Sequence, residues 1–415
     1  MNETIGRRPA AWLMALPAVW LLAMNAAAAQ DVAITNARII VGNGKVIDSG
    51  TVIVRDGKIA SVSEGTVEPR GMLKIDAKGM TAMPGFIDAH KHINTGPDEK
   101  ARMQALLDAG YTTILSGGGP AKGNITLRDH IESGLINGPR IIPSGRIPAQ
   151  QPGGKRIGIG DITPQAARAR VRELAAMGIK WTGEIALTPE PGPSKHEIQV
   201  LRAVVDEAKK AGITVQVHAV STPAMVAAVD AGVRRLVHLP NKDWVSYDAA
   251  QKLADTHTVI LGTVGFGAPI FGVFANDDKP RFRDGKPWPE SIAGANRDAH
   301  GHAMGTEAGY AMVNARTVWD RGAVLGYCTD TRYQPLAGLE HELQSYKVMF
   351  SMQDIVKLMG PNTAEYINMG DKLGTIEAGK LADIVLVNGN PLDGFWNMLK
   401  IKMVLKGGRV VVDKR

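Results

Sequence analysis

The chain has 415 residues, 44% of them hydrophobic and 21% charged, which is enough to bury a large core and too much for one minimal domain. Its formal net charge is +7, but the basic residues are scattered, with no Lys/Arg run and no basic stripe interleaved with aromatics, so the composition argues against a nucleic-acid partner. The single cysteine, Cys328, excludes an intramolecular disulfide.

The first thirty residues have the pattern of an export signal. A pair of arginines that begins at Arg7 precedes an apolar run over residues 10–24, and small residues up to Ala29 offer a cleavage site. We expect residues 1–29 to be a signal peptide that is cleaved near Ala29, leaving a bacterial protein that is periplasmic or secreted. An uncleaved membrane anchor is the alternative, but the run is short and contains Pro17, so we expect no stable anchor.

Both ends of the remaining chain have β-strand patterns. Residues 32–64 form short β-like segments separated by glycine-containing turns, and residues 381–387 and 403–412 do the same near the carboxyl end. We therefore expect residues 30–83 and 372–415 to form one small β-sandwich domain that is built from both termini.

The middle of the chain, residues 84–371, alternates strand and helix patterns. The candidate strands end near His92, Gly117, Gly145, Thr182, Val220, Pro240, Val264 and Asp330. Helical patterns lie between them, and several are followed by a glycine, as a left-handed helix cap requires. Eight strands, each followed by a helix or a long loop, predict an α/β fold of the (β/α)8 TIM barrel type. A doubly wound open sheet is the alternative, but no glycine-rich nucleotide fingerprint follows the first strand.

One connection is much longer than the others. Residues 265–308 follow the seventh strand and are rich in Gly, Pro, Phe and charge. Loops of this length are either functional lids or disordered segments, and at the mouth of a barrel we expect a lid.

Histidine and aspartate residues lie at the ends of four predicted strands. His90 and His92 end the first strand, and residues two apart on a strand project to the same side. His218, His238 and Asp330 end the fifth, sixth and eighth strands, where (β/α)8 enzymes place their reactive groups. Imidazole and carboxylate groups are ligands for zinc and its neighbours, so this set predicts a metal centre rather than five unrelated core residues.

Several longer motifs appear in order along the chain. They read MPGFIDAHKHI, GYTTILSGGG, GPRIIPSGR, AGVRRLVHLP, GYCTDT and DKLGTIEAGKLADIVLVNGNPL. In these motifs the sequence resembles the amidohydrolase superfamily, especially its imidazolonepropionase-like and dipeptidase-like branch. The resemblance implies a (β/α)8 barrel with a small β-sandwich and one or two divalent metals. It assigns His90 and His92 to the first metal, His218 and His238 to the second, and Asp330 to the first metal and to proton transfer.

Lys180 lies where two-metal members of that superfamily carry a lysine carboxylated by carbon dioxide, whose carbamate bridges the metals. Desolvation and the field of two cations would favour the neutral amine that such carboxylation needs. An ordinary lysine beside a single metal is one alternative. Glu184 is another candidate bridge, four residues on and of the same strand parity, but it falls beyond the predicted end of the strand.

Polar residues in two predicted loops are candidates for substrate binding. Relatives often have a histidine in a Gly-Gly-His stretch after the third strand, where this chain has Lys155 and Arg156. The long seventh loop adds Arg281, Arg283, His300 and His302. An arginine can hold a carboxylate with two parallel hydrogen bonds, so we expect a substrate with a carboxylate close to the cleaved bond. Charges that merely solvate the loops are the alternative.

We therefore expect a metal-dependent amidohydrolase that cleaves the amide C–N bond of a small N-acyl amino acid or dipeptide-like substrate with metal-activated hydroxide. Two divalent ions are expected, with zinc preferred and manganese, cobalt or nickel also suited to the ligands. The alternatives are a single-metal cyclic amide (lactam) hydrolase or deaminase of the imidazolonepropionase type, and a non-catalytic binding protein. A homo-oligomer is compatible with the sequence.

Overall fold

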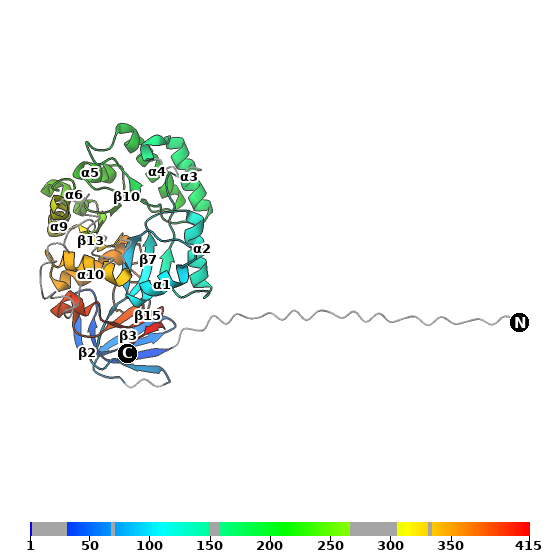
Figure 1. The fold of residues 1–415 in the computed structure, drawn as a ribbon, viewed down its shortest axis with the longest axis vertical. Coiled ribbons are helices and arrows are strands. Elements are labelled where there is room, and N and C mark those ends of the chain that lie inside the picture. Colours follow the sequence, from blue (N-terminus) through cyan, green and yellow to red (C-terminus); the bar gives the residue numbers. More distant parts are fainter. Residues whose placement is uncertain (2–30, 68–70, 149–157, 266–304, 331–333) are drawn as a thin grey trace.

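The computed structural model describes residues 1, 31–67, 71–148, 158–265, 305–330 and 334–415. A sheet formed by both ends of the chain lies beside a larger α/β body (Figure 1). The predicted signal peptide lies outside the described residues and stays a prediction. Among the described helices, none is both long enough and apolar enough to span a membrane.

The terminal sheet has eight strands in the order β16-β15-β14-β5-β1-β2-β3, with β4 paired to β1. Its strands are β1 (Val32–Ile40), β2 (Val46–Arg55), β3 (Lys58–Glu64), β4 (Leu73–Asp76), β5 (Thr81–Pro84), β14 (Ile384–Val387), β15 (Ile401–Lys406) and β16 (Arg409–Asp413). The two ends of the chain join where β5 pairs antiparallel with β14, with Met83 opposite Val385. This mixed sheet from both termini confirms the predicted composite region, while its limits at residues 83 and 372 stay predictions.

The α/β body contains eight parallel strands. They are β6 (Phe86–Lys91), β7 (Tyr111–Ser116), β8 (Arg140–Ile142), β9 (Ile185–Ala186), β10 (Gln216–His218), β11 (Arg235–Val237), β12 (Val259–Gly262) and β13 (Val324–Tyr327). The helices are α1 (Glu99–Asp108), α2 (Ala121–Glu132), α3 (Pro164–Ala176), α4 (Lys195–Ala211), α5 (Thr222–Asp230), α6 (Tyr247–Asp255), α9 (Gly305–Asp320), α10 (Pro335–Tyr346), α11 (Met352–Lys357) and α12 (Thr363–Tyr366).

These strands form two arcs, β6-β7-β8 and β9-β10-β11-β12-β13. A parallel bridge between Gly145 and Thr182 joins β8 to the fourth strand. At the other junction, Asp330 N donates a hydrogen bond to His90 O at 3.2 Å, which links the end of β13 to β6. The arrangement is that of a TIM barrel, so the predicted fold class is confirmed.

Helix α4 shows the glycine cap that the sequence predicts. It begins after its cap Ser194 and ends at Ala211. Gly212 follows with a φ of 64°, a left-handed conformation that glycine adopts without strain.

The largest difference concerns the fourth barrel strand. Seven predicted strand ends fall within three residues of the observed ends, but the fourth strand was predicted to end at Thr182 and β9 continues to Ala186. As a result, Glu184 lies within the extended chain between Thr182 and β9 rather than beyond its end.

Candidate metal centre

The first barrel strand provides two histidines at the barrel mouth. His90 is fully buried, whereas the side chain of His92 is 41% exposed. A glycine on the neighbouring strand makes room for the first ring: a Cβ on Gly117 would lie 2.6 Å from His90 Cε1. The tight fit holds the buried imidazole in one place.

Glu184 lies among four histidines. Its Oε1 is 3.1 Å from His92 Nε2, and its Oε2 is 3.0 Å from His218 Nδ1. The same Oε2 is 3.5 Å from His238 Nε2 and 3.6 Å from His90 Nε2. One carboxylate oxygen therefore faces His92, and the other faces His218, His238 and His90.

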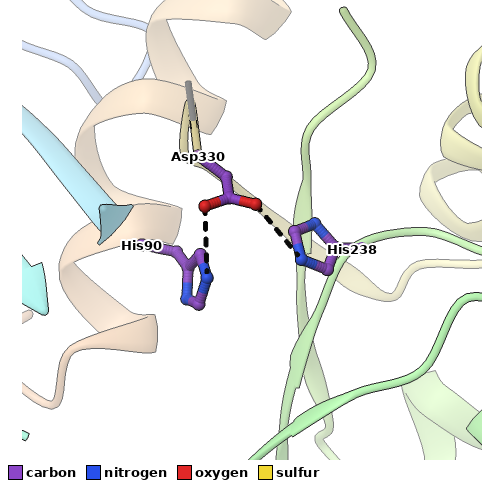
Figure 2. Close-up of side chains that lie close together, drawn as sticks. All are labelled: His90, His238 and Asp330. Carbon is purple, nitrogen blue, oxygen red and sulfur yellow. Dashed lines mark ion pairs between the residues drawn. The ribbon is translucent and has the colours of Figure 1, made fainter. Parts of the chain in front are cut away.

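Asp330 also lies beside three of these histidines, His90, His92 and His238. Its two carboxylate oxygens point toward His90 and His238, at 3.7 and 3.8 Å from their Nε2 atoms (Figure 2). Both Asp330 and His238 have left-handed backbones, with φ values of 47° and 67°. Such conformations cost a non-glycine residue about 1 kcal/mol or more and are concentrated at functional sites.

Among the residues that the structure describes, three overlapping groups of side chains could each hold a metal ion. They are His90, His92 and Glu184; Glu184, His218 and His238; and His90, His238 and Asp330. Within each group the ligand atoms lie within 4.8 Å of one another. Histidine nitrogens with carboxylate oxygens are a donor set suited to zinc and related divalent ions.

The buried ring of His90 provides an independent test of this fit. Among the described residues, neither ring nitrogen of His90 has a hydrogen-bond partner, although both are buried. Buried polar atoms are nearly always satisfied, so these nitrogens fit a metal ligand better than a structural histidine. Burial lowers the pKa of His90 to about 3, which keeps the imidazole in the neutral form that binds metals.

The two carboxylates of the site differ in their electrostatics. Burial alone would raise the pKa of Glu184, but its electrostatic interaction with His90 and hydrogen bonds from His218, His238 and His92 lower the pKa below its usual range. Glu184 is therefore ionised near neutral pH. Burial raises the pKa of Asp330, only partly opposed by His238 and His92, so Asp330 accepts a proton more readily than an exposed aspartate does.

The buried Asp88 carboxylate positions the backbone next to two of these ligands, His90 and Asp330. Its Oδ1 accepts hydrogen bonds from His90 N at 3.2 Å and Thr329 N at 3.1 Å, and its Oδ2 accepts one from Thr329 Oγ1 at 2.6 Å. Because Thr329 precedes Asp330, this buried carboxylate holds the ends of the first and eighth strands together. His238 is oriented in a similar way, with Nδ1 2.7 Å from Thr263 Oγ1.

Comparison with known families identifies the fold and the site together. The amidohydrolase family matches residues 81–260 and 298–411, which include every residue of the three ligand groups. The chain belongs to the amidohydrolase family. It is therefore a hydrolase that acts on carbon–nitrogen bonds.

Individual relatives of this amidohydrolase are distant. An imidazolonepropionase from Thermoanaerobacter pseudethanolicus is 24% identical over 399 residues, which cover 85% of this chain and 86% of that protein. A dihydroorotase from Elusimicrobium minutum is 38% identical, but only over 86 residues, or 20% of each chain.

Solved structures share the whole fold. A putative prolidase from Bifidobacterium longum has a TM-score of 0.74 at 24% identity, covering 94% of this chain and 97% of that one. A Xaa-Pro dipeptidase with bound methionine has a TM-score of 0.73 at 21% identity, and the match covers 92% of this chain and 99% of that one. At these identities the likeness concerns the fold.

The structure brings together the four predicted histidines and Asp330, but it does not bring Lys180 to them. The Lys180 side chain is exposed, and its carbonyl accepts a hydrogen bond from Thr214 N at 2.8 Å at the amino-terminal start of the fourth strand. Lys180 is therefore not among the side chains that the structure gathers around the histidines, and its carbamate stays a prediction. Glu184, the other candidate bridge, lies among those histidines.

The predicted substrate-binding residues lie outside the described part of the chain. These residues are Lys155, Arg156, Arg281, Arg283, His300 and His302. The predicted lid over residues 265–308 also falls mainly there, and both predictions stay open.

Sequence analysis missed Asp88 and Thr263 as positioning residues. Asp88 could have been predicted, because it lies two residues before His90 in the same motif and therefore projects to the same side of the strand. Thr263 had no such signal, because its role depends on the neighbouring strand that carries His238.

Proposed function

We propose that this amidohydrolase uses two divalent metal ions to hydrolyse the amide bond of a small N-acyl amino acid or dipeptide-like substrate. The observation that carries the proposal is the placement of Glu184 between two ligand groups, one with His90 and His92 and the other with His218 and His238. A carboxylate that belongs to both groups, with Oε1 against His92 and Oε2 against His218, suits a bridge between two cations. Zinc is preferred, and manganese, cobalt or nickel would suit the same ligands.

The residues of the chain divide the chemistry between them. Divalent ions bound here would supply polarisation of the substrate carbonyl and acidification of the attacking water. Asp330 takes up the proton of that water and returns it to the leaving nitrogen, a role supported by its raised pKa and its place between His90 and His238. Thr263 and Asp88 keep the ligands in position for this transfer. The products are a carboxylate and an amine.

A second candidate is a single-metal hydrolase of cyclic amides. It is favoured by the likeness to an imidazolonepropionase over 85% of this chain. The group of His90, His238 and Asp330 could hold one ion without Glu184.

The test is a hydrolysis assay with purified, metal-loaded protein. N-acyl amino acids and dipeptides are expected to be cleaved, and Asp330→Asn is expected to lower kcat by about 100- to 10,000-fold because the proton acceptor is lost. Circular dichroism and metal analysis of the variant serve as controls for folding and loading. Cleavage of lactams alone, by protein with one ion per chain, would favour the second candidate. Near-normal turnover by a loaded Asp330→Asn variant would contradict the proton-transfer role.

A further inference from the structure

Arg146 lies at the end of the third barrel strand, and we propose that its guanidinium binds the carboxylate of the substrate beside the metal centre. The inference rests on the proposed function, because it names the substrate group that the same site recognises. Arg146 belongs neither to the three ligand groups nor to the loop residues predicted from the sequence.

Strand alternation directs Arg146 toward the barrel interior. Ile142, at the end of β8, packs against the cluster of buried side chains inside the barrel, which includes Leu115 of β7 and Leu261 of β12. Ser144 follows two residues later and is fully buried. Arg146 is the next residue of the same parity, at the mouth, where the strand is held to the fourth strand by a 2.6 Å hydrogen bond from Gly183 N to Gly145 O.

Two glycines make room for the stem of this side chain. A Cβ on Gly183 would lie 3.5 Å from Arg146 Cγ, and a Cβ on Gly118 would lie 3.6 Å from it. Gly183 directly precedes Glu184, and Gly118 O is 3.5 Å from His92 Nδ1. The arginine stem therefore packs against the backbone that carries Glu184 and against the glycine whose carbonyl lies beside His92.

The guanidinium lacks the partner that similar arginines have. Arg140 and Arg170, with side chains 25% and 15% exposed, form ion pairs at 2.8 and 2.7 Å with Asp383 and Glu173. Arg146 is also partly buried, yet within the described part of the chain its guanidinium has no ion pair or hydrogen bond, and only its carbonyl is engaged, by Arg170 Nε at 3.0 Å. A partly buried cation next to the reaction site is suited to an anion that arrives with the substrate.

A substrate carboxylate fits this position in both charge and geometry. A guanidinium binds a carboxylate with two parallel hydrogen bonds, which fixes direction as well as distance. Because the stem of Arg146 is fixed beside Glu184, a carboxylate held there would place the adjacent amide of an N-acyl amino acid or dipeptide over the metal ligands.

The experiment separates binding from turnover. Metal-depleted protein is titrated by calorimetry with N-acetyl amino acids that have small, aliphatic, aromatic and acidic side chains, and with the carboxamide of each. Arg146→Gln is expected to weaken binding of the free acids by about 10- to 100-fold and to leave the carboxamides within about threefold. Arg146→Lys should recover part of the loss, because it restores the charge but not the paired hydrogen bonds. Arg172→Gln is the matched control, since Arg172 is 58% exposed on α3 and pairs with Glu207.

The same variants are then assayed for hydrolysis with metal bound. The proposal predicts that kcat/KM falls for the acids and is retained for the carboxamides. It is overturned if Arg146→Gln binds the acids as the unmutated protein does, if acids and carboxamides weaken equally, or if the unmutated protein binds no acid more tightly than its carboxamide. Absence of hydrolysis together with Arg146-dependent acid binding would instead contradict the proposed function and leave the carboxylate site standing.

Discussion

Glu184 and Lys180 illustrate what a motif can and cannot predict about single residues. The histidines and Asp330 were recognised because each lies at or near the end of a short apolar strand, a pattern that is local in the sequence. The choice between Glu184 and Lys180 depended on how far the fourth strand extends. That length is set by pairing with β10, where Ile185 lies opposite Val217 and Ala186 opposite His218. Pairing between strands has no signature within either strand alone.

Matched substitutions at these two positions test which residue bridges the metals. Glu184→Ala is expected to lose at least half of the bound metal and to lower turnover by about 100-fold or more, because it removes the anion that faces four histidines. Lys180→Ala should keep both metal content and activity, because its side chain is exposed at the far end of the strand. Metal analysis of the two purified variants is the measurement. Loss of metal from Lys180→Ala, with full retention by Glu184→Ala, would restore the lysine bridge.

Among the elements, α4 and the loop before it show which contacts are local in the sequence. Ser194 Oγ accepts a hydrogen bond from Glu197 N, and the Glu197 carboxylate accepts one from Ser194 N. Glu197 also accepts hydrogen bonds from Thr188 N and Thr188 Oγ1, at 3.0 and 2.9 Å. The motif could be read from the sequence, but the contact with Thr188 could not, because it depends on where the chain goes after β9.

The charge on Glu197 should make the stability of this segment depend on pH. Burial would raise the pKa of Glu197, but hydrogen bonds from Ser194 and Thr188 outweigh it and hold the pKa below its ordinary value of 4.5. The ionised group therefore stabilises the fold fully above that value, and its contribution is lost as the pH falls through the lower pKa of the folded state.

Glu197→Gln should accordingly lower the unfolding free energy of metal-depleted protein by about 1 to 2 kcal/mol near pH 7. The difference from the unmutated protein should shrink as the pH falls below 4.5. Urea unfolding at both pH values measures it, with Glu173→Gln as the control, because Glu173 is 60% exposed and pairs with Arg170. If Glu197→Gln lowers the free energy of unfolding equally at both pH values, the Glu197 side chain stabilises the fold through its packing and not through its charge.

For the molecule as a whole, the fold was predictable because alternating strands and helices repeat along the chain, and each repeat is a local pattern. Closure of the barrel was not visible in the sequence. It depends on contacts between the ends of the body, such as the hydrogen bond from Asp330 N to His90 O and those that Thr329 donates to Asp88. Those contacts also assemble the site, since they bring ligands about 240 residues apart into one group. Substrate recognition involves positions such as Arg146 whose surroundings come from three different strands.

The claim that Glu184 bridges two metal ions can be tested by an anomalous-scattering map from crystals of the zinc-loaded protein. The account predicts two peaks roughly 3.5 to 4 Å apart. One should contact His90 and His92, the other His218 and His238, with the Glu184 carboxylate between them. A single peak, or two peaks without contact to Glu184, would contradict it.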